Sequence, residues 1–373
     1  MREDIQMRNA LNVISSFDNQ LPLHMHLKNY FREHKNMGSK DRKILSAIVF
    51  GYFRIKGKRQ PDAMEEMIIA GAKNSEYGNP FYEYWKLKSG NDISNEKISF
   101  ENYFPIANHV SGQIDKESFF NSHFIQPKIW IRCRKEKASE VIAELKLKEY
   151  AFEQFDKFII SFIKSYPLDQ LETFSKGYFE IQDIASQKTI ELLNPQKNES
   201  WWDCCAGAGG KSLLLLEAQP QIQLFISDNR ESILNNLRER FERSGFRNYN
   251  LFLADLTKKE SLKRVPEFDC VLADVPCSGS GTWGRSPEWL FFFKEDQLKK
   301  YISLQRLLVS NAVEKLKAGG NLIYITCSVY EDENEKQVEW FMENLNMELL
   351  TSKYLQYSNE GGDTMFGARL KKK

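Results

Sequence analysis

Two cysteines of this sequence lie 50 residues apart, and each follows a run that is typical of a buried strand. Cys277 ends the motif Asp274-Val-Pro-Cys, which overlaps the end of the run FDCVLADV, and Cys327 lies in Thr-Cys-Ser directly after NLIYIT. In a parallel α/β sheet the carboxyl ends of the strands gather at one edge, where ligands bind. Two thiols at that edge, beside a glycine-rich turn at 205–210, suggest paired-cysteine chemistry on an activated methyl group.

Methylation of a pyrimidine at C5 is a reaction that needs such a pair. C5 is a poor nucleophile, but a thiolate that adds at C6 creates an enamine, and C5 can then attack a methyl sulfonium. A carboxylic acid near N3 assists by donating a proton, a role that suits Asp274, and a base must later remove the C5 proton. One cysteine would be the nucleophile and the other would aid release, and the spacing alone leaves both assignments open. The plainer alternative is an inert buried thiol.

A glycine-rich turn and two further acids predict a cofactor site at the same edge. The turn follows the run WWDCC and opens a helix, so its amides can approach a ligand. It matches neither the dinucleotide fingerprint nor the P-loop. Asp228 ends the next strand, where an acid commonly holds a ribose diol, and Asp255 ends the third, near an adenine. Each acid could instead cap a helix or loop. The turn residues are Cys205, Ala206, Gly207, Ala208, Gly209, Gly210 and Lys211.

The elements that must position these residues alternate from about residue 190 onward. Strand-like runs are separated by predicted helices at 211–218, 231–243 and 296–317, which favours a doubly wound parallel sheet. The segment 126–185 reads as a small α+β unit, and 1–125 as mostly helical, with no clear elements over 71–125. We therefore expect three domains, 1–125, 126–185 and a catalytic domain at 186–373.

Composition limits the function classes. The 373 residues carry a net charge of only +1, but residues 1–60 hold 12 Lys/Arg against 5 Asp/Glu, which indicates nucleic-acid binding or an ordinary solvated helical surface. No Cys-x-x-Cys occurs, which argues against zinc, and no other metal is expected. The first residues lack the apolar core of a signal peptide, and no run is long enough to cross a membrane. We expect a cytoplasmic protein with free thiols.

Taken together, these motifs resemble the RNA cytosine-5 methyltransferases of the Nol1/Nop2/Sun (Fmu) family. The similar segments are 182–187 (QDIASQ), 205–211 (CAGAGGK), 274–281 (DVPCSGSG), 326–335 (TCSVYEDENE) and 365–371 (MFGARLK), within a region of about 125–373. The resemblance implies a Rossmann-like methyltransferase domain with an RNA-recognition-like subdomain. It also implies Cys327 as the nucleophile and Cys277 as the residue that aids release. S-adenosylmethionine would contact 205–211, Asp228, Asp255 and Asp274.

The sequence also departs from the family pattern. Ala208 replaces a usual proline, and Gly284 replaces the first of two usual arginines, which affects an RNA-phosphate contact. The segment 38–54 is similar to the NusB-like helical domain of the family's small-subunit rRNA members. We therefore expect an RNA methyltransferase acting on rRNA. The alternatives are a tRNA substrate, a catalytically silent RNA-binding assembly factor, or a nicotinamide-dependent dehydrogenase, which the missing fingerprint disfavours.

Overall fold

The computed structural model describes residues 2–59, 64–75, 77–89 and 98–373. The chain forms two compact units, one of Met1–Pro127 with Thr282–Glu295 and one of Lys128–Gly281 with Asp296–Lys373. Residues 1 and 60 of the predicted basic segment lie outside the described residues, as do 76 and 90–97 of the segment 71–125. None of the helices in the described part is long and apolar enough to cross a membrane.

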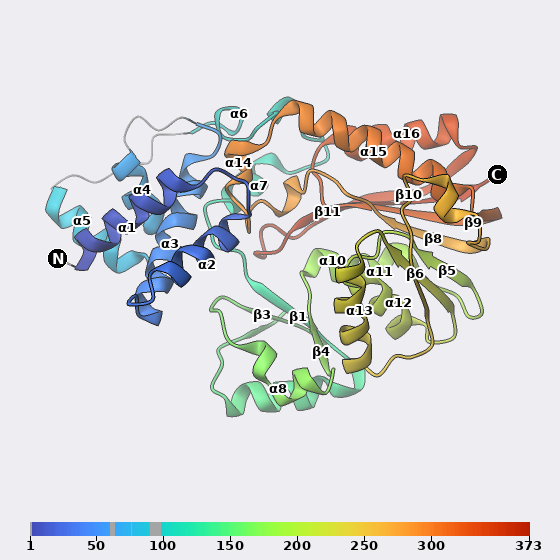
Figure 1. The fold of residues 1–373 in the computed structure, drawn as a ribbon, viewed down its shortest axis with the longest axis horizontal. Helices are drawn as coiled ribbons and strands as arrows, with labels where there is room; N and C mark the ends of the chain where they lie inside the picture. The colour runs from blue at the N-terminus through green and yellow to red at the C-terminus, as the bar shows by residue number, and fades with distance from the viewer. Residues whose placement is uncertain (1, 60–63, 76, 90–97) are drawn as a thin grey trace. The chain divides into compact units, whose positions relative to one another are not determined.

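The first unit is helical, as predicted (Figure 1). Its first helices bury the apolar positions that recur at helical spacing, including Ala10, Val13 and Ile48. Two glycines let helices α3 and α4 approach closely, because a Cβ atom on Gly51 would lie 2.1 Å from the carbonyl oxygen of Gly71. The helices are α1 Arg2–Ser16, α2 Leu23–Glu33, α3 Ser39–Lys56, α4 Met64–Ala72 and α5 Asn79–Ser89.

The described residues of the segment 71–125, for which the sequence predicted no clear elements, contain short helices and an aromatic cluster. Helices α5, α6 Phe100–Tyr103 and α7 Lys116–Ser122 are short, and Pro105 and Gly112 lie between α6 and α7. Phe100 stacks on Phe104 at 5.2 Å, and Tyr103 meets Phe120 edge to face at 5.1 Å. Contacts between aromatic rings, rather than apolar residues at helical spacing, hold this segment together. The hydrophobic pattern of the sequence therefore did not predict its helices.

The segment Thr282–Glu295 joins the helical unit although it is distant in sequence. Helix α14 Trp289–Phe292 lies in this segment. Arg54, which is buried, donates through Nη2 to the carbonyl of Gly284 at 3.1 Å. The amide of Leu23 donates to Oε1 of the buried Glu288 at 3.2 Å. The sequence did not predict this insertion.

The second unit begins with a four-stranded antiparallel sheet in the order β2-β3-β1-β4. Ile131, Val141 and Ile160 are fully buried between this sheet and helix α8. This is the small α+β unit that the sequence predicts. Its elements are β1 Ile129–Cys133, α8 Ala138–Leu147, β2 Glu153–Gln154, β3 Ile159–Phe162, α9 Glu172–Ser175 and β4 Phe179–Ile181.

A seven-stranded sheet in the order β10-β11-β9-β8-β5-β6-β7 forms the rest of the second unit. Strands β5 to β9 run parallel, and β10 and β11 are antiparallel additions at one edge. The strands are β5 Ser200–Asp203, β6 Gln223–Asp228, β7 Asn250–Leu253, β8 Phe268–Asp274, β9 Leu316–Thr326, β10 Met347–Gln356 and β11 Thr364–Lys372. This confirms the predicted α/β fold class.

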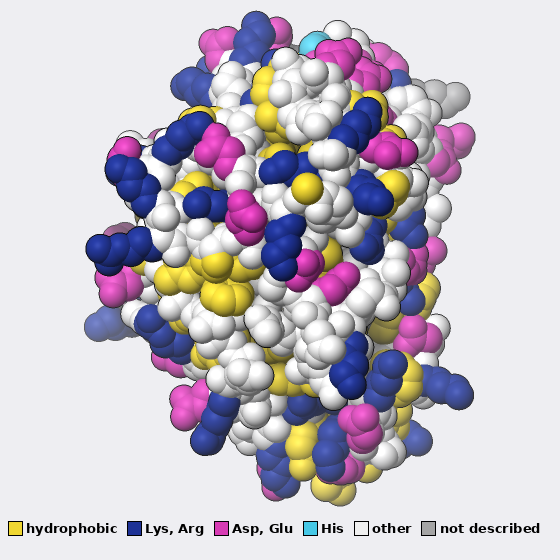
Figure 2. Space-filling view, turned by 90° about the vertical axis from the view of Figure 1, so that its right-hand side faces the viewer, with side chains coloured by type: hydrophobic (Ala, Val, Ile, Leu, Met, Phe, Trp, Pro, Cys, Tyr) yellow, Lys and Arg dark blue, Asp and Glu magenta, His cyan; other side chains and the backbone are white. Residues whose placement is uncertain are grey.

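Apolar residues cover both faces of this sheet. Trp201 and Trp202, both fully buried, belong to two different core clusters because successive strand residues point to opposite faces. The helices of this part are α10 Ile184–Lys188, α11 Ile190–Leu193, α12 Gly210–Ala218, α13 Glu231–Arg243, α15 Glu295–Val313 and α16 Glu335–Asn344. Basic and acidic side chains are interspersed on the face that Figure 2 shows.

Candidate active site

Parallel strands bring most of the predicted site residues to one sheet edge. Strands β9, β8, β5 and β6 are neighbours in that order, and all four are parallel. Asp274 ends β8, Asp228 ends β6, and Cys327 follows the last residue of β9. The glycine-rich turn leaves β5 between them. The edge therefore collects the two thiols, the turn and the acids that the sequence predicts to act together.

The two cysteines are in direct contact. Their Sγ atoms lie 3.3 Å apart, and the amide of Cys327 also donates to Sγ of Cys277 at 3.3 Å. Both are free thiols and partly exposed. The hydrogen bond with Cys327, together with burial, raises the pKa of the Cys277 thiol well above its ordinary value. Cys277 therefore keeps its proton near neutral pH and can donate it toward the sulfur of Cys327.

A buried glutamate holds the loop that carries Cys277. Glu333, which is fully buried, accepts from the amide of Ser278 at 2.9 Å and from its hydroxyl at 2.5 Å. Gln305 of α15 donates to the same carboxylate at 2.9 Å and to the carbonyl of Pro276 at 3.0 Å. Burial raises the pKa of Glu333 above its usual value. These contacts fix the loop on both sides of Cys277.

A second set of contacts holds the loop that carries Cys327. The hydroxyl of Thr326 donates to Oδ1 of Asn334 at 2.5 Å, and Nδ2 of Asn334 donates to the carbonyl of Ser328 at 2.9 Å. The amide of Gly281 donates to the carbonyl of Cys327 at 2.9 Å. The two cysteine loops are thereby joined by backbone as well as by sulfur.

A lysine from the glycine-rich turn pairs with Asp274. Lys211, in the first turn of α12, donates to Oδ2 of Asp274 at 2.5 Å and is 8% exposed. Burial alone would lower its pKa, but the charge and hydrogen bond of Asp274, with a contribution from Cys327, raise the pKa of Lys211 above its usual value. Lys211 therefore keeps its positive charge beside Asp274, within electrostatic reach of Cys327.

Asp203 at the end of β5 is a buried acid that the sequence analysis did not include in the site. Its Oδ2 accepts from the hydroxyl of Ser212 at 2.5 Å, and the residue is 1% exposed. Burial raises the pKa of Asp203 to about 7, and the charge of Asp274 acts in the same direction. The Asp203 carboxyl therefore titrates near neutral pH beneath the Lys211–Asp274 pair.

The glycine-rich turn has the backbone shape expected of a ligand cradle. Gly207 and Gly209 have φ angles of +53° and +77°, which other residues rarely adopt. A Cβ atom on Gly207 would meet no atom within 4 Å, so the turn opens onto free space there. Ala208, where the family usually has proline, is exposed, and its carbonyl accepts from Arg240 at 3.0 Å.

Asp228 lies beside this turn and is already hydrogen-bonded within the protein. Its Oδ2 accepts from the amide of Gly207 at 2.9 Å, and Arg230 pairs with both carboxylate oxygens at 2.9 and 3.1 Å. Burial would raise its pKa, but these partners lower the pKa of Asp228. The side chain of Arg230 is 59% exposed, so it can move aside and leave acceptor positions for a ligand's hydroxyl groups.

Asp255 mainly stabilises its own loop. Its Oδ1 accepts from the amide and hydroxyl of Thr257 at 3.0 and 2.6 Å, and Lys258 lies 3.1 Å from Oδ2. The capping role that the sequence left open is therefore present, whatever else Asp255 contacts. Among the described residues, no three His, Cys, Asp or Glu side chains form a group that could hold a metal ion.

Several residues of the site could not be read from the sequence. Glu333 lies in the acidic run Glu331-Asp-Glu-Asn-Glu335 and differs from the other acids of that run in being fully buried. Gln305 is one of several polar residues on α15, and Arg230 is an ordinary loop arginine. Their roles depend on tertiary contacts, so no local pattern marks them.

Comparisons with known proteins find relatives that match this region of the sequence. Residues 190–367 match the family model described as 16S rRNA methyltransferase RsmB/F. A probable ribosomal RNA small subunit methyltransferase B from Coxiella burnetii is 36% identical over 176 residues, which cover 46% of this chain and 41% of that protein. Its counterpart from Synechocystis is 30% identical over 279 residues, covering 70% and 62%. The chain thus spans about two fifths to three fifths of the length of these relatives.

A solved structure supports the fold. NSun6 from Pyrococcus horikoshii, determined with SFG, superposes with a TM-score of 0.62 over 71% of this chain and 96% of that chain, at 18% identity. The sequence motifs, the family match and the relatives agree with one another. Residues 190–367 are thus similar in sequence to the 16S rRNA methyltransferases RsmB/F.

Proposed function

We propose that this protein methylates C5 of a cytosine in RNA, with small-subunit rRNA as the substrate class and S-adenosylmethionine as the methyl donor. The observation that carries the proposal is the 3.3 Å contact between the Sγ atoms of Cys277 and Cys327 at the carboxyl edge of the sheet. Carbon methylation through a covalent adduct needs one sulfur to attack and a second group to help it leave.

The electrostatics support Cys327 as the nucleophile, the role that the family motif also implies. Cys327 contributes to the raised pKa of Lys211, so this ammonium interacts electrostatically with the sulfur that is proposed to attack. Cys277, with its raised pKa, remains a thiol and donates a hydrogen bond to that sulfur. Two adjacent thiolates would repel each other, so one charge shared in this way is the stable arrangement.

The reaction then follows in two stages. The thiolate of Cys327 adds to C6, a carbon–sulfur bond forms, and the Lys211–Asp274 pair shares a proton with N3 as the ring electrons move toward C5. After C5 has gained its methyl group, a base removes the C5 proton and the bond to Cys327 breaks. The thiol of Cys277 stabilises the departing sulfur. The C5=C6 bond re-forms, Cys327 is again a thiolate, and the cytosine carries a methyl group in place of the C5 hydrogen, whose proton passes from the general base to solvent.

The methyl donor fits the turn beside this pair. The open space at Gly207 and the carboxylate of Asp228 suit an adenosine moiety, and 205–211, Asp228, Asp255 and Asp274 are the residues that would hold it. S-adenosylmethionine, when bound, supplies an electrophilic methyl group. The chain's own contribution is to orient the base and to hold the two thiols and the Lys211–Asp274 proton in place.

Bisulfite mapping of RNA from cells that lack this protein tests the substrate. We expect loss of 5-methylcytosine at one position of small-subunit rRNA, with restoration by the wild-type chain but not by Cys327→Ala. Loss confined to tRNA would instead favour a tRNA substrate. Unchanged methylation in every RNA, with a ribosome-assembly defect, would favour a silent assembly factor.

A further inference from the structure

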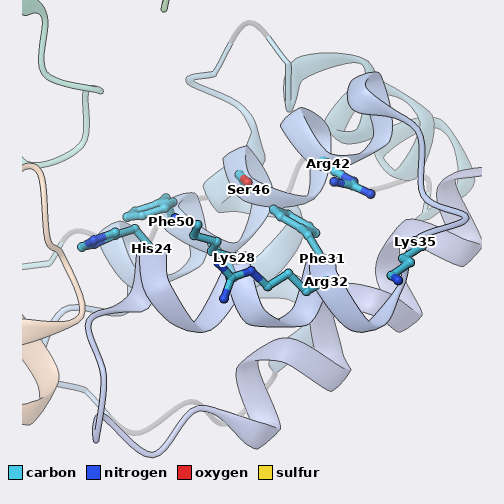
Figure 3. A pocket seen from close by; sticks show the side chains of 9 residues that line it. His24, Lys28, Phe31, Arg32, Lys35, Arg42, Ser46 and Phe50 are labelled. Atoms are coloured by element: carbon cyan, nitrogen blue, oxygen red, sulfur yellow. The ribbon is translucent and has the colours of Figure 1, made fainter.

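A basic pocket lies between helices α2 and α3 of the helical unit, and the chemistry proposed above does not use it. Its volume is about 530 Å³, within the range of pockets that hold a small organic group. Figure 3 shows His24 and Phe50 at one end, Phe31 in the middle, and Arg42 and Lys35 toward the other end. The remaining lining residues are Leu27, Lys28, Arg32 and Ser46.

The spacing of these residues places them on two facing helix surfaces. His24, Lys28, Phe31 and Lys35 recur at intervals of three or four residues along α2 and the residues just after it. On α3 the lining residues Arg42, Ser46 and Phe50 recur every four residues. Such intervals keep side chains on one side of a helix. The pocket is therefore built from two continuous faces rather than from a chance gap.

The charges of the pocket are all of one sign. Its lining includes Lys28, Arg32, Lys35 and Arg42 but no Asp or Glu. Lys28, Arg32 and Lys35 are exposed, and none of them forms an ion pair with any other described residue. On the face in Figure 2, by contrast, basic and acidic side chains are interspersed. Unpaired cations gathered around one pocket favour an anionic ligand.

The aromatic residues exclude a purely ionic partner. Phe31 and Phe50 are half-buried and contribute ring surface to the pocket, and the guanidinium of Arg42 lies 5.7 Å from the centre of the Phe31 ring. A simple anion would contact the basic side chains but would make no use of the two aromatic rings. An unpaired base uses both, because bases stack on aromatic rings and on guanidinium planes while basic side chains follow the phosphates.

We propose that the pocket between α2 and α3 binds an unpaired nucleotide of the RNA substrate, with the base against Phe31 and Phe50 and the adjoining phosphates on Lys28, Arg32 and Lys35. This deepens the proposed function, since it rests on RNA being the substrate. The site lies in the helical unit, so it serves affinity and selection of the RNA rather than chemistry. A base in a continuous duplex cannot enter, which makes the pocket selective for loops, bulges and single strands.

The test uses the full chain and a fluorescein-labelled uridine RNA of about 12 nucleotides, a length that spans one single-strand site. Lys28→Ala combined with Arg32→Ala should lower the slope of log affinity against log salt by about 1.4, since each single-strand phosphate contact contributes about 0.7. Phe31→Leu keeps an apolar side chain and should weaken binding about 5- to 100-fold, with an unchanged salt slope.

The matched control removes the same charge elsewhere in the helical unit. Arg8→Ala combined with Lys116→Ala replaces two exposed cations that do not line the pocket, and it should leave both affinity and slope near wild type. RNA carrying 4-thiouridine should also crosslink to peptides from residues 24–50 of the wild-type protein.

The outcomes separate the pocket from the proposed function. If the wild type binds and methylates RNA but the pocket variants match the control, the pocket proposal is wrong while the function stands. If the wild type neither binds nor methylates any RNA, the proposed function is wrong, and the pocket proposal, which rests on it, is wrong as well. An oligo-glutamate peptide with the same net charge as the RNA serves as a competitor. If it displaces the RNA with an affinity equal to that of the RNA, the pocket is a site for acidic proteins and the proposal is wrong.

Discussion

Around the two cysteines, single side chains set the charges on which the proposed chemistry depends. Lys211 supplies a positive charge, Cys277 supplies a hydrogen bond, and Asp203 carries a carboxyl whose pKa is about 7 beneath the Lys211–Asp274 pair. The motifs in the sequence predicted the cysteines, Lys211 and Asp274. They did not predict Asp203 or Glu333, because the properties of both depend on burial.

The carboxyl of Asp203 should make stability depend on pH. Its folded pKa of about 7 lies above the ordinary 3.8, so the folded state binds more protons than the unfolded state between these values. The contribution of Asp203 is therefore fully favourable below about pH 4 and declines as pH rises to about 7, by at most about 1.4 kcal/mol per pH unit. Asp203→Asn should remove this decline in urea unfolding measured across that window.

Asp255→Asn is the matched control for that measurement. Hydrogen bonds from Thr257, ahead of the opposing effect of burial, lower the pKa of Asp255, so its titration lies below the window. The slope of stability against pH should match wild type in this control. If the slope of stability against pH in Asp203→Asn equals the slopes in wild type and in Asp255→Asn, then Asp203 is charged over the whole window and this prediction is wrong.

Cofactor affinity should depend on Asp228 and not on its arginine partner. Asp228→Ala removes the acceptor for ribose hydroxyl groups, and two charge-assisted hydrogen bonds at about 1.5–3 kcal/mol each imply at least a tenfold loss of S-adenosylmethionine affinity. Arg230→Ala frees the same carboxylate and should bind at least as tightly as wild type. Calorimetry of S-adenosylmethionine binding measures both affinities. An equal loss of affinity in the two variants would mean that the ribose does not bind to the carboxylate of Asp228.

At the scale of elements, the loops after β8 and β9 depend on one close approach. A Cβ atom on Gly281 would lie 1.9 Å from the carbonyl oxygen of Thr364 in β11 and 3.2 Å from that of Cys327. Gly281→Ala should therefore displace the cysteine loops, with about 1–3 kcal/mol of destabilisation and a fall in kcat. Denaturant unfolding and methyl-transfer rates measure both effects.

Gly112→Ala provides the control, because its Cβ atom would meet nothing within 4 Å. We expect its stability to stay within about 0.5 kcal/mol of wild type, as for most surface changes. A Gly281→Ala enzyme with wild-type stability and rate would mean that the loops shift freely without moving the sulfurs.

The parallel strands could be predicted from the sequence because each is a short apolar run that ends at a polar residue. Strand β11 was predicted only through its resemblance to a family segment. Strand β10 was not predicted, since Met347–Gln356 carries polar residues at the sheet edge. Helices α5 to α7 were missed because Gly, Asn and Pro interrupt their periodicity. Local pattern fails where an element is held by aromatic packing or lies at an edge.

At the scale of the whole molecule, the chain passes from the Cys277 motif into the helical unit and back. The motif of Cys277 ends at Gly281, and the residues from Thr282 to Glu295 belong to the helical unit before the chain returns at Asp296. Leu23 and Arg54 hold that segment through hydrogen bonds. Deleting residues 1–60 would remove both partners. The basic pocket is therefore better tested by substitutions than by truncation.

The central claim is that Cys327 forms a covalent bond to the RNA and that Cys277 helps to break it. The most direct measurement is a denaturing gel of Cys277→Ser after incubation with S-adenosylmethionine and labelled substrate RNA. We predict a retarded RNA–protein band that survives denaturation, absent from Cys327→Ala and from the double variant. An RNA band that runs free in Cys277→Ser, or an adduct that persists in Cys327→Ala, would contradict the account.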